Sequence, residues 1–505
     1  MSLLTRSSTV DGILRRSAAR YTGSTALIFG DRTWSYQDLD DAVSRVAAHL
    51  LGLGLTAGDR VAALGRNSDA YLIGFLACAR AGLIHVPLNY NLLGGELDYL
   101  LTQSGSTALL LDPALETSLA GIPEATLAGL AHRVPLRDAE GSVISVATEG
   151  AVPVVDVEVA DDDLVQLLYT SGTTSRPKGA MMSHRALVHE YLSCIVELDL
   201  ATDDNPLHVM PLYHSAQMHV FLLPWLAIGA TNTVLEVPDP AEVLRRIEQD
   251  GHRAFFAAPT LWVAVANHGD FAASDLSGLR KAYYGASIMP GPVLKRLLDK
   301  APECGFYNCF GQSEVAPLTC VLRPEDHATR PDSAGRPVLF VESRVVDAQA
   351  QEVPVGQSGE IVYRSPQLCD GYWDNEEATA EAFADGWFHS GDLVRVDEEG
   401  YIFVVDRIKD VINTGGVLVA SREVEDALYT HPAVAEVAVV GVPDEKWVEA
   451  IAAFVVRKAD VDEAGLIEHV RGQLAAFKVP KQVTFIDDLP RNASGKILKR
   501  ELRDG

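Results

Sequence analysis

Positive charge is scarce in this sequence: 42 lysines and arginines stand against 69 aspartates and glutamates, a formal net charge of −27 at pH 7. Nucleic-acid binding requires a basic face, so this balance argues against a nucleic-acid partner. Small anionic ligands remain compatible with it, because a local cluster of N–H groups and lysines outweighs a distant negative field that salt screens beyond ~8 Å.

Long apolar runs and closely spaced cysteines are also lacking. The longest strongly apolar run, Val220–Ala230, contains Pro224 and is shorter than the ~20 residues that a membrane-spanning helix needs. The first residues lack the apolar core of a signal peptide. The six cysteines are scattered without metal-ligand spacing. We therefore expect a cytoplasmic protein with no transmembrane segment and with reduced thiols that serve as small core residues.

Helical and strand patterns alternate along most of the chain. Apolar residues recur at helical spacing over 36–53 and 70–81, whereas 59–65, 107–111 and 164–168 are typical of short strands. Strands that alternate with helices favour mostly parallel sheets covered by helices. The pattern therefore predicts an α/β fold, which resumes at residue 164 and continues to about residue 320.

The pattern then changes to short strands separated by turns, expected over 343–346, 360–363, 393–396 and 401–405. A compact α+β tail follows, with expected strands over 434–440 and 451–456 and an expected helix over 462–475. Charged residues dominate 406–410 between two apolar stretches, so a domain boundary is placed there.

The predicted organisation has two domains. Residues 1–406 form a large N-terminal domain, with two βα sheets over about 1–334 and a small β unit over about 335–405. Residues 407–505 form a small α+β C-terminal domain.

Residues 169–179 are the most informative segment, with the sequence Tyr-Thr-Ser-Gly-Thr-Thr-Ser-Arg-Pro-Lys-Gly. A strand precedes this segment, and Ser183 is a candidate cap for a following helix. Glycines let the backbone approach a ligand, N–H groups and hydroxyls donate hydrogen bonds, and Lys178 adds charge, so the segment is typical of a polyphosphate-binding loop. It is not a Walker A loop, because Pro177 precedes Lys178 and Gly179 follows it.

Further strings combine residue types that carry chemistry. They are Phe310-Gly-Gln-Ser-Glu314, Trp387-Phe-His-Ser-Gly-Asp392, Asp406-Arg-Ile-Lys-Asp410 and Pro490-Arg-Asn-Ala-Ser-Gly-Lys496. With residues 30–62 and Pro211-Leu-Tyr-His-Ser215, and in this order, they cover nearly the whole chain. The sequence resembles the adenylate-forming superfamily of acyl-CoA synthetases, luciferases and peptide-synthetase adenylation domains.

The resemblance implies an AMP-forming acid–thiol ligase with a large N-terminal domain and a small, mobile C-terminal lid. A carboxylic acid and ATP would give an acyl-adenylate and pyrophosphate, with Mg²⁺ as the metal. A thiol, expected to be that of CoA, would then take the acyl group.

The resemblance also assigns the nucleotide site. The β- and γ-phosphates would be held by Thr170, Ser171, Gly172, Thr173, Thr174 and Lys178. The remainder of the nucleotide would contact Gly285, Ala286, Ser287, Phe310, Gly311, Ser313, Gly415 and Gly416. Glu314 would bind Mg²⁺, a hard ion that prefers carboxylate oxygen. Asp392 would accept hydrogen bonds from the ribose hydroxyls, with Arg407 assisting nearby.

Three residues have predicted roles in the reaction itself. Lys496 would reach the α-phosphate and the substrate carboxylate, where its charge stabilises the forming P–O bond. Lys409 matches the hinge at which the lid of this family is thought to rotate between the two half-reactions. His214 matches a position near the acyl carboxylate and the thiol tunnel, where it would orient or gate the substrate, a structural histidine being the alternative.

The acyl pocket, placed by resemblance, draws on residues 214–220, 257–259, 286–289 and 315–318. These segments contain no arginine or lysine and many small or apolar residues, with pocket candidates Ala216, Val220, Ala258, Ile288, Val315 and Ala316. A dicarboxylic acid would need a second cation, which disfavours malonate. A fatty, aryl or bulky alicyclic or terpenoid acid is therefore expected.

One stretch departs from the family pattern. After Gly415-Gly416, acyl-CoA synthetases usually carry Glu-Asn-Val-Tyr-Pro, and this chain carries Val417-Leu-Val-Ala-Ser421. Because this segment faces the pantetheine path in the family, a carrier-protein thiol supplied in trans is an alternative acceptor to CoA. A catalytically silent nucleotide-binding homologue and a luciferase-like oxidase are the remaining alternatives.

Overall fold

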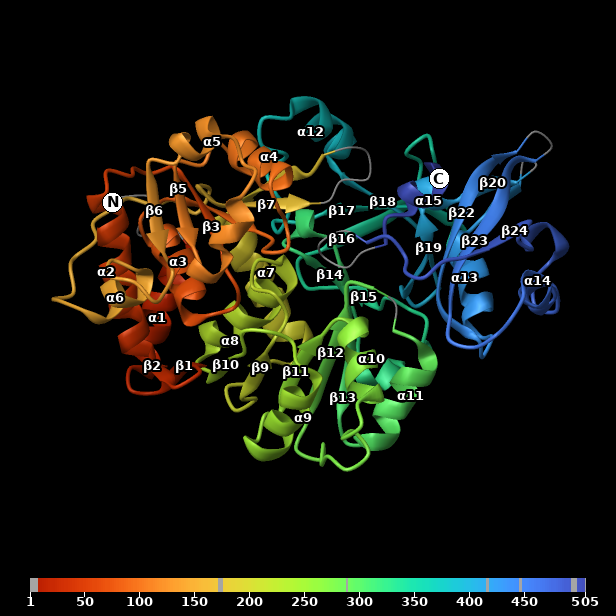
Figure 1. Ribbon diagram of the computed structural model, residues 1–505, viewed down its shortest axis with the longest axis horizontal. Helices are drawn as coiled ribbons and strands as arrows, with labels where there is room; N and C mark the ends of the chain where they lie inside the picture. Colours follow the sequence, from red (N-terminus) through yellow and green to blue (C-terminus); the bar gives the residue numbers. More distant parts are fainter. Residues whose placement is uncertain are drawn as a thin grey trace. The chain divides into compact units, whose positions relative to one another are not determined.

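The computed structural model describes residues 8–170, 176–287, 289–414, 417–444, 447–491 and 497–504. The chain divides into two compact units, Met1–Glu342 with Tyr363–Phe388, and Ser343–Val362 with His389–Gly505 (Figure 1). The boundary expected at residue 406 lies within the second unit, so the extent of the mobile lid stays a prediction. The α/β class, the two sheets and the small β unit are confirmed.

A six-stranded sheet occupies the first part of the first unit, in the order β6-β5-β3-β4-β7-β8. Its strands are β3 (Arg60–Leu64), β4 (Ile84–Leu88), β5 (Ala108–Leu111), β6 (His132–Pro135), β7 (Leu164–Thr170) and β8 (Lys178–Ser183). Neighbours are parallel except β7 and β8, which are antiparallel. The sequence pattern predicts β7 and not β8, so the glycine- and hydroxyl-rich segment connects two paired strands.

The second sheet of this unit has nine strands in the order β15-β14-β13-β12-β11-β9-β10-β1-β2. They are β1 (Thr25–Phe29), β2 (Arg32–Ser35), β9 (Pro206–His208), β10 (Asn232–Val234), β11 (Ala254–Ala257), β12 (Lys281–Gly285), β13 (Gly305–Gly311), β14 (Leu318–Leu322) and β15 (Arg336–Pro337). The strands from β1 to β13 in this order are parallel, and β2, β14 and β15 run antiparallel to their neighbours. The sheet therefore brings the ends of β12 and β13 to one edge.

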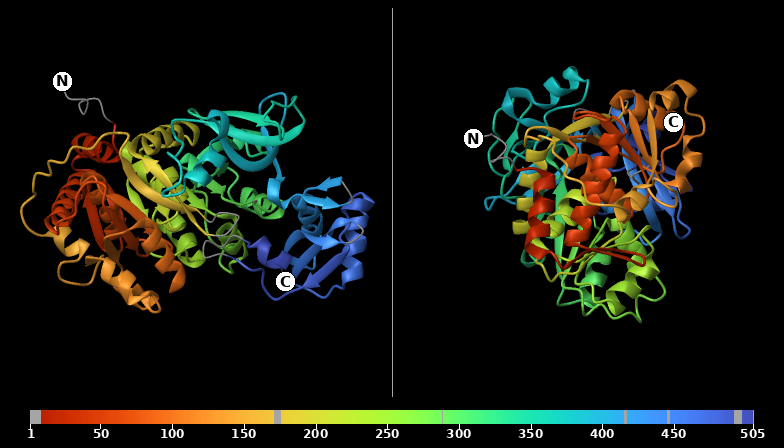
Figure 2. Two further views of the ribbon diagram at one scale, coloured as in Figure 1. Left: turned by 90° about the horizontal axis from the view of Figure 1, so that it is seen from above. Right: turned by 90° about the vertical axis from the view of Figure 1, so that its left-hand side faces the viewer.

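Helices cover both sheets. They are α1 (Val10–Tyr21), α2 (Tyr36–Gly52), α3 (Asp69–Arg80), α4 (Gly95–Ser104), α5 (Glu124–Gly129), α6 (Val143–Thr148), α7 (His184–Glu197), α8 (Leu223–Ile228), α9 (Pro240–Gln249), α10 (Pro259–Asn267), α11 (Gly291–Lys300) and α12 (Glu376–Ala382). In Figure 2, α1, α2 and α3 pack against one another in red and orange.

Local sequence explains where several helices begin. The Ser35 hydroxyl accepts from the Asp38 N–H and the Asp38 carboxylate accepts from the Ser35 N–H, a capping box that starts α2. The Ser183 hydroxyl accepts from the Ala186 N–H, as expected for the helix after the predicted phosphate loop. Every residue of α3 is buried, and its only charged side chains are those at the two ends, Asp69 and Arg80.

The second unit begins with a four-stranded sheet in the order β16-β17-β18-β19. Its strands are β16 (Glu342–Val346), β17 (Ser358–Arg364), β18 (Phe388–Val396) and β19 (Ile402–Arg407). The structure thus contains the predicted small β unit, and β18 starts five residues earlier than the pattern predicts, at Phe388 rather than Leu393. The segment before Leu393 carries Asp392, so this candidate ribose ligand lies on a strand and not in a turn.

The remainder of the second unit is a second sheet with helices. The strands β21-β20-β23-β22 neighbour one another in this order, and β24 pairs with β23. The elements are β20 (Ile412–Thr414), β21 (Val417–Val419), α13 (Ser421–Tyr429), β22 (Val434–Asp444), β23 (Val448–Arg457), α14 (Glu463–Arg471), β24 (Gln482–Phe485) and α15 (Lys499–Asp504). Helix α14 ends at Arg471, earlier than predicted, with Gly472 at its C-cap position.

Two predictions about composition can be compared with the fold. All six cysteines are free and buried, which confirms that they are core residues. Within the described ranges, no helix is long and apolar enough to cross a membrane. The apolar run Val220–Ala230 instead continues the π-helical turn Ala216–Leu222 into α8.

Candidate active site

The two ends of the glycine- and hydroxyl-rich segment are held opposite each other. Thr170 ends β7, Lys178 starts β8, and the two residues are paired across the antiparallel ladder. Both side chains are half-buried. Eight of the predicted site residues lie outside the described residues, namely Ser171, Gly172, Thr173, Thr174, Ile288, Gly415, Gly416 and Lys496.

Helix α4 anchors this segment from one side. The Tyr99 hydroxyl donates to the Pro177 carbonyl at 3.0 Å. The Arg176 guanidinium lies 5.0 Å from the centre of the Tyr99 ring. The Tyr169 hydroxyl donates to Oε1 of Gln103, one turn further along α4. Burial raises the pKa of Tyr169, so this donor stays protonated.

Glu314 lies in the short turn Ser313–Val315 that follows β13, and its carboxylate meets the phosphate segment. Its Oε1 accepts hydrogen bonds from the Thr170 hydroxyl at 3.1 Å and from the Tyr372 hydroxyl at 3.0 Å. The Ser313 hydroxyl lies 3.1 Å from that of Ser215. The structure therefore brings together three motifs that are far apart in the sequence, those of Thr170, Ser215 and Glu314.

A segment that the sequence analysis missed connects these parts. Within residues 367–373, the Cys369 N–H donates to the Glu314 carbonyl at 2.8 Å, and the Trp373 N–H donates to the Gly179 carbonyl at 2.8 Å. The Lys178 ammonium lies 5.1 Å from the centre of the Tyr372 ring. The sequence signal was the run Gly371-Tyr372-Trp373, a flexible residue followed by two aromatic residues.

The ends of β12 and β13 carry the predicted adenosine contacts. Gly285 lies opposite Cys309, and Ala286 and Ser287 follow it with exposed side chains. Phe310 is half-buried at the end of β13 and Gly311 is exposed. Ligands of open α/β sheets bind at this edge, beyond the carboxyl ends of parallel strands.

Two glycines of this edge are required by packing. A Cβ on Gly285 would lie 2.1 Å from the Cys309 carbonyl oxygen, and a Cβ on Gly311 would lie 1.8 Å from the Pro317 carbonyl oxygen. Both distances are far below van der Waals contact, and the atoms approached belong to the backbone, which cannot move aside without breaking the ladder. These glycines therefore permit close strand packing whether or not they also touch a ligand.

His214 lies in the turn before the π-helical segment that contributes to the predicted acyl pocket. Its Nδ1 accepts from the Ala216 N–H at 3.3 Å. Desolvation lowers the pKa of His214, so the ring is neutral at neutral pH. Among the pocket candidates, Val220, Val315 and Ala316 are buried, whereas Ala216 and Ala258 are half-buried.

Buried histidines behind this turn form a structural network. His219 Nε2 bonds to Gln166 Oε1 at 2.8 Å, and Gln166 Nε2 bonds to His85 Nδ1 at 3.1 Å. The Tyr191 hydroxyl lies 2.9 Å from His219 Nδ1. Burial lowers the pKa of His85 and of His219 to about 3, so both rings stay neutral and hold the π-helical turn against β4 and β7.

A buried carboxyl group, also missed by the sequence analysis, supports the Glu314 turn. Glu190 on α7 accepts from the Leu318 N–H at 2.9 Å and from the Gln367 side-chain amide. The Ser193 hydroxyl donates to Gln367 Oε1 at 2.6 Å. Burial raises the pKa of Glu190 to about 8. A single glutamate in an amphipathic helix gives no sequence signal of such a site.

Within the second unit, the predicted ribose residues are neighbours. Asp392 on β18 and Arg407 on β19 are paired across the ladder, and Arg407 Nη1 donates to Asp392 Oδ1 at 2.7 Å. The same nitrogen donates to the Ser390 carbonyl at 3.0 Å. Asp392 is 4% exposed, and the Arg407 guanidinium gives its buried carboxylate a charged hydrogen-bond partner. The two residues are in contact, and their role toward ribose stays a prediction.

The predicted hinge residue, Lys409, is exposed on the turn Ile408–Asp410. Contacts join the two sides of this turn. Asp406 accepts from the Ser421 N–H at 2.6 Å and from its hydroxyl at 2.8 Å. Asp410 accepts from Arg503 at 2.7 Å.

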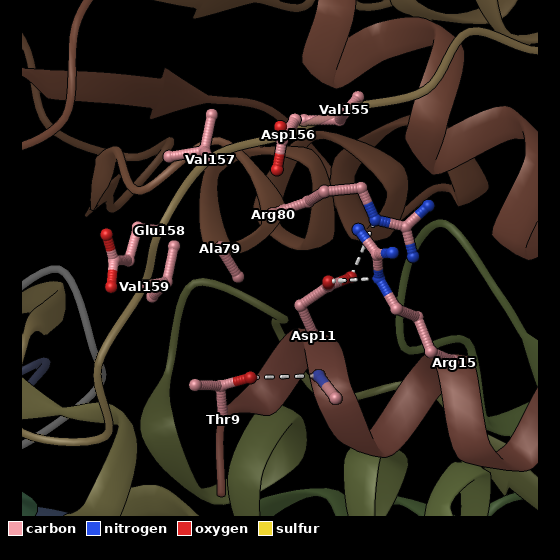
Figure 3. Close-up of a pocket in the computed structure, with 11 residues that line it drawn as sticks. Thr9, Asp11, Arg15, Ala79, Arg80, Val155, Asp156, Val157, Glu158 and Val159 are labelled. Atoms are coloured by element: carbon pink, nitrogen blue, oxygen red, sulfur yellow. Dashed lines mark hydrogen bonds and ion pairs between the residues drawn. The ribbon is translucent and has the colours of Figure 1, made fainter. Parts of the chain in front are cut away.

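A separate hollow of about 290 Å³ lies between α1, α3 and residues 155–159 (Figure 3). Asp11 accepts from Arg15 at 2.6 Å and from Arg80 at 2.7 Å, and Arg80 also donates to the Ser44 hydroxyl at 2.6 Å. These charged groups satisfy one another, as in a structural ion-pair network. The hollow is therefore not included in the candidate site.

The geometry at Glu314 fits a magnesium ligand. Two donors occupy Oε1, and Oε2 accepts no hydrogen bond within the part of the chain that the structure describes. Mg²⁺ in nucleotide sites is commonly held by one or two carboxylates together with substrate phosphates. A carboxylate with one oxygen fixed and the other open, beside Thr170 of the predicted phosphate loop, is compatible with such a donor set.

Comparisons with known proteins agree with this geometry. Residues 14–373 match a family described as "AMP-binding enzyme", and residues 423–496 match "AMP-binding enzyme C-terminal domain". A feruloyl-CoA synthase of Amycolatopsis sp is 40% identical over 492 residues, with 97% of each chain covered.

Two further relatives extend the comparison. The 3-[(3aS,4S,7aS)-7a-methyl-1,5-dioxo-octahydro-1H-inden-4-yl]propanoyl:CoA ligase of Mycobacterium tuberculosis is 35% identical, with 98% of each chain covered. ATP-bound MatB from Rhodopseudomonas palustris has a TM-score of 0.89 at 31% identity, with 98% of each chain covered. The chain belongs to the AMP-binding, adenylate-forming acyl-CoA ligase superfamily and is an ATP-dependent acid–CoA ligase.

Proposed function

We propose that this ligase activates an apolar monocarboxylic acid, with aryl acids as the first candidates, as the acyl-adenylate and then transfers the acyl group to CoA. The observation that carries the proposal is the contact between Thr170 and Glu314, 3.1 Å long, which joins the phosphate segment to the candidate metal ligand. Lys178 lies across the ladder from Thr170 and completes a mixed-charge site suited to a metal-bound triphosphate.

The residues have distinct tasks in this proposal. Thr170 and Lys178 bind the β- and γ-phosphates, and Glu314 holds the Mg²⁺ that shields their charge when it is bound. Lys496 aligns the acid carboxylate with the α-phosphate and neutralises charge there. A carboxylate is a poor nucleophile toward an anionic triphosphate, so alignment and electrostatic stabilisation supply most of the acceleration.

The acid is proposed from the lining and from the relatives. The pocket segments carry no arginine or lysine, and three of the candidates, Val220, Val315 and Ala316, are buried apolar side chains. The names of the two relatives specify an aryl and a bulky alicyclic acid, and the aryl relative is the more similar of the two. Each buried methylene adds ~0.8 kcal/mol, so affinity is expected to rise with hydrophobic bulk until the pocket ends.

The test is pyrophosphate release across a panel of acids, with and without CoA. Hydroxycinnamic acids, benzoic acids, medium-chain fatty acids and a bulky alicyclic propanoate form the panel, with acetate and malonate as the polar controls. We expect an aryl acid to give the highest kcat/KM and CoA to be consumed in equal amount. A preference for acetate or malonate would overturn the proposed substrate class.

One observation keeps a carrier-protein thiol as a second candidate acceptor. The segment that departs from the family pattern forms β21, where Val417 is 45% exposed and Leu418 is 69% exposed. An exposed apolar pair in place of Glu-Asn suits a protein surface as well as a pantetheine chain. Adenylate trapped by hydroxylamine without any CoA consumption would favour this acceptor over CoA.

The cellular compartment is proposed from the state of the cysteines. Six free and buried cysteines suit a reducing compartment, and we place the reaction in the cytoplasm.

We predict that Lys409→Pro separates the two half-reactions. The proline ring fixes φ, so a turn that must rotate at this residue is locked. ATP–pyrophosphate exchange should stay within a few-fold of wild type, and transfer of the acyl group to the thiol should fall by a much larger factor. Lys409→Ala, which leaves φ free, is the matched control. Equal loss of both half-reactions in the proline variant would reject the hinge.

A further inference from the structure

Tyr372 touches both charged partners of the candidate phosphate site. Its hydroxyl donates to Oε1 of Glu314 at 3.0 Å, and its ring faces the Lys178 ammonium at 5.1 Å. Tyr372 is 8% exposed, so most of its side chain is shielded from water. One side chain thus sits between the candidate metal ligand and the phosphate-binding cation.

The backbone around Tyr372 is fixed on both sides. The Met181 N–H donates to the Gly371 carbonyl at 2.9 Å, and the Trp373 N–H donates to the Gly179 carbonyl at 2.8 Å. The Tyr372 N–H itself donates to the Thr379 hydroxyl at 2.9 Å. Tyr372 is therefore held against β8 as an added strand would be, and its phenol has little freedom to leave Glu314.

The consequence for Glu314 follows from rotation of its carboxylate. A glutamate χ3 torsion is broad and roughly two-fold, so an unrestrained carboxylate offers either oxygen in many directions. Tyr372 and Thr170 both donate to Oε1, which fixes the carboxylate plane and leaves Oε2 as the outward oxygen. Such outer partners commonly change metal affinity by ~10- to 100-fold when they are removed.

We propose that Tyr372 is a positioning residue that orients Glu314 toward Mg²⁺·ATP and steadies Lys178 beside it, an inference that rests on the proposed function. The hydroxyl acts on the carboxylate and the ring acts on the ammonium, so the two contributions are separable by substitution. Tyr372→Phe removes only the hydroxyl, and Tyr372→Leu removes the ring as well.

The experiment measures metal binding directly. Mn²⁺, an EPR-visible substitute for Mg²⁺, is titrated into protein with ATP and no acid, and the Mg²⁺ dependence of pyrophosphate release is measured separately. We expect Tyr372→Phe to weaken Mn²⁺·ATP binding by ~10-fold and to raise the half-saturating Mg²⁺ concentration similarly. The KM for the acid should not change. Tyr372→Leu should in addition weaken binding of ATP in the absence of metal.

Tyr36→Phe is the matched control, because Tyr36 is a buried tyrosine of the same unit whose hydroxyl donates to the Ala230 carbonyl at 2.8 Å. It should lose a similar amount of thermal stability and keep wild-type Mn²⁺·ATP binding. A Tyr372→Phe variant with wild-type metal binding, or one that differs from wild type only as Tyr36→Phe does, overturns the proposal for Tyr372. A wild-type protein that binds no Mn²⁺·ATP would instead overturn the proposed function.

A double substitution tests the shared acceptor. Thr170→Val removes the second donor to Oε1. If both donors fix one carboxylate, the combined variant should lose less binding than the two separate losses multiplied together, because either single loss already frees the group. Strictly multiplicative losses would show that Tyr372 acts elsewhere.

Discussion

Lys496→Ala is expected to lower acyl-adenylate formation by ~10²–10³-fold, the scale for loss of one preorganised electrostatic contact. The lysine ends the loop Pro490-Arg-Asn-Ala-Ser-Gly-Lys496, and the match to the C-terminal domain of AMP-binding enzymes extends to this residue. Negative charge develops where the carboxylate meets the α-phosphate, and a lysine there acts without the reorganisation that water would need.

ATP–pyrophosphate exchange with the best acid of the panel is the measurement. Lys458→Ala, at an exposed lysine of the same unit, is the control for loss of one positive charge. Transfer from chemically prepared acyl-adenylate to CoA should survive in Lys496→Ala, because the lysine is assigned to the first half-reaction alone. Exchange near the wild-type rate would contradict the assignment, and so would loss of both half-reactions together.

The second large effect is on stability and concerns Glu190. Burial raises the pKa of its carboxyl group from an ordinary 4.5 to about 8. The unfolded chain thus releases this proton at lower pH than the folded chain does. Through that window the folded state binds more protons, so the free energy of unfolding falls as the pH rises, by ~1.4 kcal/mol per pH unit for this one group.

Glu190→Gln should remove this dependence. Glutamine has no proton to lose, and its carbonyl can still accept from the Leu318 N–H, but its NH₂ group replaces the oxygen that accepts from the Gln367 side-chain amide. Near the lower end of the window the variant should be less stable than wild type by ~1–3 kcal/mol, because the Gln367 amide loses its acceptor. Between there and pH 8 the stability difference should shift by several kcal/mol in favour of the variant, because the variant has no proton to lose.

Thermal and urea unfolding across this window, expressed as variant minus wild type, isolates the contribution of Glu190 from all other titrating groups. Glu248→Gln on α9, at an exposed glutamate, should follow the wild-type curve throughout. Parallel curves for Glu190→Gln and wild type would mean that the carboxyl group titrates near its ordinary pKa despite its burial.

Many residues of the candidate site could be predicted, because they lie in short sequence motifs. The run at 169–179 predicts a phosphate loop from residue types alone, and the resemblance relates it to Glu314, whose carboxylate the structure brings to 3.1 Å from the Thr170 hydroxyl. Asp392 and Arg407 were likewise expected to be near each other, and the structure has them paired.

The supporting residues were not predictable, for a physical reason. Tyr372 and Glu190 act through positions that tertiary folding alone determines, one on a segment added to β8 and the other inside a helix. A single tyrosine or glutamate has the same local sequence pattern whether its side chain faces solvent or a buried hydrogen-bond partner. Strand β8 was missed for a similar reason, since its pairing with β7 is a contact between separate segments that its own periodicity does not reveal.

The contact between Asp406 and Ser421 joins the two sides of the predicted hinge residue, Lys409. Helix α13 has no cap from its own preceding residue, Ala420, and its first N–H is satisfied by Asp406 from the far side of Lys409. The usual family proline at position 421 would have neither that N–H nor a hydroxyl. If the backbone rotates at Lys409 and separates Asp406 from Ser421, α13 loses this N-terminal cap, which would cost ~1 kcal/mol of helix stability. If this rotation occurs, the side chain at 421 would influence how readily the protein passes from adenylate formation to acyl transfer.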